Sequence, residues 1–113
     1  MLSKEFLKEY EIHRCQPSSE LNIIVDDHYA ERFKERKVGS HRTVALMLQK
    51  LPLILDQLRE IELGHKVWIY KPAFEVALGL QRQMDKKGMV EFVLRTVIPW
   101  APHKDGITDI ITV

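Results

Sequence analysis

The chain has 113 residues, a length that favours a single domain, and 45% of its residues are hydrophobic while 29% are charged. This composition excludes a disordered tail, a collagen-like repeat and a small disulfide-stapled protein. Seventeen Lys and Arg residues oppose sixteen Asp and Glu residues, giving a formal net charge of +1. Net charge therefore neither favours nor excludes a nucleic-acid partner, and any basic surface must be local.

A single cysteine limits the chemistry that the chain can carry. Cys15 has no second cysteine with which to form an internal disulfide or a zinc site built from paired cysteines. The first ten residues include charged side chains and lack the apolar core of a signal peptide. No apolar run approaches the ~20 residues needed to span a bilayer. We therefore expect a cytoplasmic protein, in the host cytoplasm if a phage encodes it, without membrane contact.

The first half of the chain has mainly helical periodicity. A turn is expected at 15–19, where Pro17 and two serines follow Cys15, and a β-branched strand at 21–25. Asp26 or Asp27 can cap a helix that runs to about residue 37. Pro52 is expected to break the helical stripe and start a new turn, and Gly64 to end it. The predicted helices cover residues 2–10, 27–37, 40–51 and 52–64.

The second half alternates between apolar and polar residues, as strands do. The predicted strands cover 66–71, 74–80, 89–98 and 107–113, with a hairpin turn at 85–88 and a longer loop at 99–106. Sequential strands with short turns favour antiparallel pairing. The sequence therefore predicts an α+β domain over residues 1–113, with N-terminal helices packed on one face of a mostly antiparallel four- to five-stranded sheet.

One predicted helix carries a basic stripe. His28, Arg32 and Arg36 recur at four-residue steps, with two glutamates between them. Arginine binds phosphate with two parallel hydrogen bonds, and histidine exchanges protons near neutral pH. Cleavage of RNA needs a base for the 2′-hydroxyl proton and cations for the phosphate, so the stripe has suitable groups. The alternative is a solvated helix face whose Glu–Arg pairs contribute only ~0.3–0.5 kcal/mol each.

Cations also fall in the predicted strands. Arg95 interrupts a long apolar strand, so it lies on an open sheet face or is paired. Together with Arg82 and Lys71 it could bind phosphate, while Tyr70 or Trp68 stacks on a base. The alternative is ordinary alternation with the polar side in water.

The loop after the long strand holds His103 and Lys104, with Trp100 nearby. This loop would place an aromatic ring and two possible cations at one end of the sheet, or it is an ordinary exposed loop. The five histidines lack the spacing of a helical metal site, so we expect neither a metal nor another cofactor.

Three stretches carry a resemblance to a known group. They are His28-x-x-x-Arg32-x-x-x-Arg36, Leu94-Arg-Thr-Val97 and the closing Ile110-Ile-Thr-Val113. In this order the chain resembles the RelE/BrnT-like toxin superfamily of small phage and bacterial proteins, and it is similar to phage endoribonucleases of the RegB type. The resemblance covers 21–113 and leaves 1–20 as an N-terminal extension. It implies a RelE-like α+β core that acts on RNA, with ribosome association in some members.

The resemblance also implies site residues, with one departure. His28 falls where the group places a histidine at the start of the first long helix. The phage nucleases have a second histidine on the following helix, but here that helix interior reads Leu46-Met-Leu48 and His41 lies only at its start. His103 is therefore the remaining candidate for a second proton-transfer group.

These observations lead to one expected function and two alternatives. We expect an RNA-directed protein, a metal-independent endoribonuclease with His28 and His103 as catalytic residues. The expected RNA-binding residues are Arg32, Arg36, Arg82, Arg95 and Lys104. The first alternative is a non-catalytic phage accessory protein that binds RNA or a host or antitoxin-like protein. The second is a structural protein that dimerises through an edge strand at 107–113.

Overall fold

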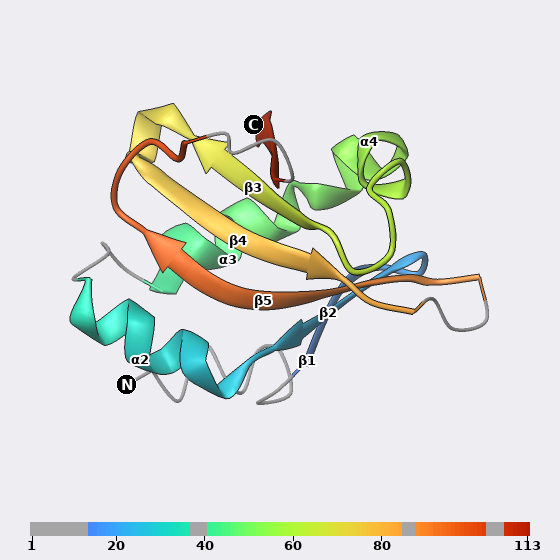
Figure 1. Cartoon of the computed structure of the whole chain (residues 1–113), viewed down its shortest axis with the longest axis horizontal. Helices are drawn as coiled ribbons and strands as arrows, with labels where there is room; N and C mark the ends of the chain where they lie inside the picture. Colours follow the sequence, from blue (N-terminus) through green and yellow to red (C-terminus); the bar gives the residue numbers. More distant parts are fainter. Residues whose placement is uncertain (1–13, 37–40, 85–87, 104–107) are drawn as a thin grey trace.

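The structure is a computed structural model that describes residues 14–36, 41–84, 88–103 and 108–113 (Figure 1). Its centre is a six-stranded sheet in the order β1-β2-β5-β4-β3-β6. The strands are β1 (Arg14–Ser18), β2 (Leu21–Val25), β3 (Lys66–Lys71), β4 (Val76–Arg82), β5 (Val90–Ile98) and β6 (Thr108–Thr112).

The sheet is mixed. β1 pairs with β2, β3 with β4 and β4 with β5 in antiparallel fashion, whereas β2 pairs with β5 and β3 with β6 in parallel. The predicted fold, with N-terminal helices on a mostly antiparallel four- to five-stranded sheet, is therefore wrong. The physical reason is that β2 inserts beside β5, far away in the sequence. Local periodicity identifies a strand but does not specify a remote partner.

The helices do not form one N-terminal layer either. They are α2 (Asp27–Glu35), α3 (His41–Gln49) and α4 (Leu55–Arg59), with single 3-10 turns η1 (Leu51–Ile54) and η2 (Pro72–Phe74). α3 crosses behind β4 and β5, whereas α2 lies beside β5 in line with β2 (Figure 1). β2 pairs only with residues 90–94 of the longer β5, so α2 occupies the place beside the rest of that strand.

The core lies between the sheet and α3. Side chains from α2, α3 and alternate positions of the strands form one buried cluster, represented by Tyr29, Phe33, Met47, Leu48, Ile69, Leu78 and Phe92. Tyr29 and Phe33 are one helical turn apart, which places both on the face of α2 that packs inward. The opposite sheet face is called the open face below. It carries residues that alternate along the strands with core residues and are cross-strand partners of one another: Lys66, Trp68, Gly79, Gln81 and Thr96.

Several local predictions are confirmed. Asp26 caps α2, Pro52 lies in the first turn of η1, and β3 has the expected bounds. The turn expected at 15–19 is wrong, because residues 14–18 form β1; Pro17 is tolerated there because β1 is an edge strand. The helix predicted at 2–10 lies outside the described residues. In the part of the chain that the structure describes, no helix is long and apolar enough to cross a membrane.

Candidate functional site

A β-bulge shapes the open face next to α2. In the β4–β5 ladder, Gly79 pairs with Thr96 and Leu80 pairs with Leu94, so Arg95 is an extra residue in β5. A bulge re-aims the side chains that follow it. As a result Leu94 and Val97 are both buried in the core, while the two polar residues between them lie outside it.

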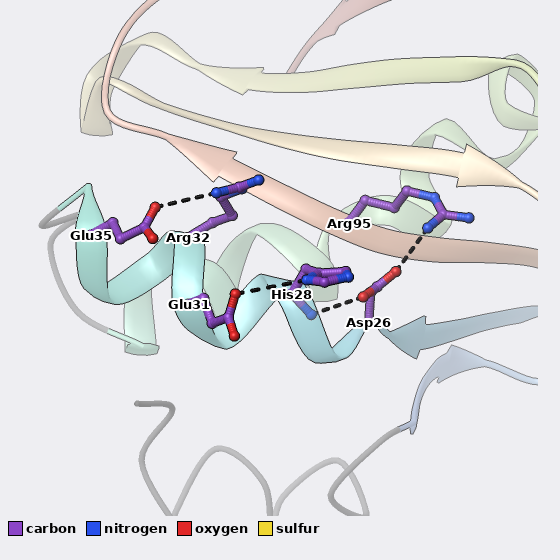
Figure 2. A network of polar contacts seen from close by, with 6 residues as sticks. All are labelled: Asp26, His28, Glu31, Arg32, Glu35 and Arg95. Atoms are coloured by element: carbon purple, nitrogen blue, oxygen red, sulfur yellow. Dashed lines mark hydrogen bonds and ion pairs between the residues drawn. The ribbon is translucent and has the colours of Figure 1, made fainter.

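Asp26 joins this bulge to the start of α2. One carboxylate oxygen accepts a hydrogen bond of 2.8 Å from the backbone N–H of His28, which caps the helix. The other accepts a charge-assisted bond of 2.8 Å from Nη1 of Arg95 (Figure 2). Gln81 accepts a hydrogen bond from Nε of the same guanidinium. Arg95 is thus held on two sides, and its side chain, 43% exposed, is still open to a ligand.

The side chains of His28 and Arg32 lie on α2 along the same border (Figure 2). Nδ1 of His28 lies 3.7 Å from Glu31, and Nη1 of Arg32 lies 3.3 Å from Glu35. The His28 side chain is 74% exposed. Exposed pairs of this kind contribute only about 0.2–1 kcal/mol, so a phosphate could replace the glutamates at little cost. His28 and Arg32 therefore lie on one side of α2, toward β5, as the four-residue spacing predicted (Figure 2).

Arg36, the third member of the stripe, ties α2 to β5. Its Nη1 donates to Oγ1 of Thr96 at 2.8 Å and to the carbonyl of Val97 at 3.1 Å. Its guanidinium carbon lies 5.7 Å from the ring centroid of Trp100, within cation–π range. These contacts give Arg36 a structural role at the end of the helix.

Arg82 is also engaged with the backbone. Its Nη1 donates to the carbonyls of Arg59 and Ile61 at 2.7 and 2.6 Å. These carbonyls lie at and just after the C-terminal end of α4, where helix carbonyls lack partners within the helix. Arg82 therefore caps α4, a role that its position in an alternating strand did not indicate.

The two histidines predicted to be catalytic are not brought together. α2 runs alongside β5 from His28, near Leu94, to Arg36, near Val97. A helix rises about 1.5 Å per residue, so these ends of α2 are about 12 Å apart. His103 is exposed and follows the C-terminal end of β5, at the Arg36 end. Lys104 lies outside the described residues.

A hollow of about 200 Å³ opens on the open face beside the bulge. Lys66, Trp68, Gln81, Arg95 and Thr96 contribute to its lining. Sequence reasoning missed Gln81 and Thr96, although two consecutive polar residues in an apolar strand, Arg95 and Thr96, are a signal for a bulge. The expected cation Lys71 lies elsewhere, with its Nζ 6.0 Å from the Phe74 ring centroid.

Comparison with models of known protein families, with curated proteins and with solved structures finds no match for this chain. Its function must therefore be inferred from its own residues. Among the described residues, no group of three or more His, Cys, Asp or Glu side chains is placed to hold a metal ion.

Proposed function

We propose that this protein acts on RNA in the cytoplasm and cleaves it without a metal ion, with chemistry of the RelE/RegB type. The observation that carries the proposal is the Asp26 carboxylate, which joins the first turn of α2, with His28, to the guanidinium of Arg95. The exposed imidazole of His28 thereby lies on the same side of the molecule as the fixed cation of Arg95, and Arg95 also lines the hollow.

In the proposed reaction, Nε2 of His28 takes the proton from a ribose 2′-hydroxyl. The 2′-oxygen then attacks the adjacent phosphorus, and the bond from phosphorus to the 5′-oxygen breaks. The imidazolium returns the proton to the leaving 5′-oxygen, so the products are a 2′,3′-cyclic phosphate and a 5′-hydroxyl end. Arg95 and Arg32 stabilise the charge that builds up on the phosphate in the transition state.

The second candidate is an RNA-binding protein without catalysis, such as an accessory factor that also contacts the ribosome or a host or antitoxin-like protein. The position of His103 favours it, because that imidazole follows the far end of β5 and is not beside His28. In the reaction above one imidazole serves as both base and acid, whereas two groups can each have a pKa matched to one role.

The test is an incubation of the purified chain with end-labelled single-stranded RNA, with and without EDTA, followed by measurement of cleavage and retention in the same tubes. The variants are His28→Ala and the control His65→Ala. His65 is a matched control because it is also exposed and also lies near a glutamate three residues away in the sequence, with Nε2 3.4 Å from Glu62.

We expect the parent and His65→Ala to cleave equally in EDTA, and His28→Ala to lose at least 100-fold in rate, the lower range for a general base. Equal cleavage by His28→Ala would refute the role of the imidazole. Retention without cleavage by the parent would support the second candidate. If the parent neither retained nor cleaved RNA, the proposal of an RNA target would be refuted altogether.

A further inference from the structure

Gly79 lets two residues that line the hollow, Trp68 and Thr96, approach closely over β4. A Cβ atom at this position would lie 2.6 Å from Cγ2 of Thr96 and 3.1 Å from the indole of Trp68. Trp68 and Thr96 are the cross-strand neighbours of Gly79 on either side. The absence of a side chain at Gly79 therefore allows the indole of Trp68 to lie over β4, where its ring lines the hollow.

The polar lining is fixed in place on one side. Gln81 donates to the carbonyl of Gly64 at 2.8 Å and accepts from Nε of Arg95, so both ends of its amide are held. Arg95 is held in turn by Asp26. Lys66, the cross-strand neighbour of Gln81, is exposed at the start of β3 and adds a second cation to the lining. A ligand would meet a flat ring flanked by two positive charges.

The size of the hollow limits the ligand. Pockets for drug-sized molecules have volumes of roughly 300–1,000 Å³, so about 200 Å³ suits a single planar ring system. The flanking cations favour a ring that carries phosphate. A base with its phosphate combines these features, and aromatic side chains bind single-stranded nucleic acid by stacking on such bases.

We propose that the hollow binds one base of single-stranded RNA, stacked on Trp68, with the neighbouring phosphate held by Arg95 and Lys66. This inference rests on the proposed function, because the Asp26 carboxylate that binds Arg95 also accepts a hydrogen bond from the backbone N–H of His28. The subsite would set which nucleotide lies next to the scissile phosphate, and so it would give the protein its base preference.

The test uses a single-tryptophan form of the full chain. Trp100→Phe leaves Trp68 as the only tryptophan, since the chain contains two. The probes are hexanucleotides of each base with 2′-O-methyl groups, which remove the nucleophile and prevent cleavage. Indole fluorescence reports the subsite, and polarization of a labelled copy reports overall binding. We expect quenching that saturates at the concentration where polarization saturates, with one base preferred.

Variants then separate stacking from general binding. Trp68→Leu should weaken binding roughly 5- to 150-fold, the range expected for the loss of one stacked base. Phe74→Leu is the control, since it removes another exposed aromatic at the far end of the same hairpin. If Trp68→Leu does not fold, as judged by circular dichroism, Lys66→Gln tests the same site. That variant should reduce the slope of log affinity against log salt by about one.

The possible outcomes are distinct. Binding and cleavage of RNA without quenching, with Trp68→Leu or Lys66→Gln equal to the parent, would overturn the base subsite and leave the proposed function intact. A nucleoside monophosphate that quenches as tightly as the hexamer would also overturn it, because the hollow would then serve a free nucleotide. A flat polarization signal with every RNA would overturn both proposals.

Discussion

Replacement of Asp26 tests the link on which the site depends. The carboxylate makes two contacts, a cap on the His28 amide and an ion pair with Arg95. Asp26→Ala removes both. Loss of a helix N-cap costs typically ~1 kcal/mol, within a range of ~0.5–2. The ion pair is half exposed on the Arg95 side, so solvent screening limits it to about 0.2–1 kcal/mol.

Asp26→Asn separates these two contributions. Asparagine caps a helix about as well as aspartate, so this variant should lose mainly the ion pair. We expect the free energy of unfolding to fall by about 1–3 kcal/mol in Asp26→Ala and by less than about 1 kcal/mol in Asp26→Asn, measured by urea denaturation. For a chain of this size about 1 kcal/mol corresponds to roughly 4 °C in Tm.

Two results would refute this reasoning. Equal losses in the two variants would mean that the cap contributes little and that charge dominates. A loss below about 0.3 kcal/mol in Asp26→Ala would mean that water replaces both contacts. A double-mutant cycle with Arg95→Met isolates the ion pair, and it should give a coupling energy of about 0.2–1 kcal/mol.

Three further predictions concern stability. Gly79→Ala should lower the free energy of unfolding by about 1–3 kcal/mol by overpacking. Adding Thr96→Ser should recover part of this loss, because it removes the methyl group 2.6 Å from the new Cβ. No recovery would mean that the clash lies elsewhere. Arg82→Met should lower the free energy of unfolding in urea by about 1–3 kcal/mol, because Nη1 of Arg82 caps carbonyls at the end of α4. The same variant should leave the salt dependence of RNA binding unchanged. A smaller slope of log affinity against log salt would instead support the RNA contact predicted for Arg82. Burial raises the pKa of Tyr29, so the contribution of its neutral phenol to the free energy of unfolding is fully present below the ordinary pKa of 10.0 and is lost as pH rises above it. Tyr29→Phe should therefore flatten the fall in stability at alkaline pH. An unchanged pH profile of stability would contradict this.

Local signals in the sequence predicted most elements correctly, because each depends on near neighbours. Asp26 caps α2 through the backbone amide of His28, two residues away. Pro52 starts a new turn because its ring fixes φ and removes the backbone N–H. The arrangement of the strands was not predictable in the same way. β2 pairs with β5 in parallel across 69 residues, from Leu21 to Val90, and nothing in either segment specifies the other.

The site was predicted in part for the same reason. Four-residue spacing placed His28 and Arg32 on one side of α2, and the structure has them there. It could not distinguish Arg32 from Arg36, because both occupy the same stripe. The difference arises from what each guanidinium meets: Arg36 reaches a carbonyl and a hydroxyl of β5, whereas Arg32 meets only a glutamate of its own helix in the contacts described above.

The bulge at Arg95 explains why the cation and the hollow occur together. Strict alternation from Leu94 would turn Thr96 into the core and Val97 outward, placing a hydroxyl among apolar side chains. The extra residue shifts the register, so Val97 is buried and Thr96 pairs with Gly79 on the open face. The same shift leaves Arg95 without a cross-strand partner and at the side of the strand, within reach of Asp26. One inserted residue therefore completes the core, opens the hollow and directs a cation toward α2, and a deletion of Arg95 should disturb all three at once.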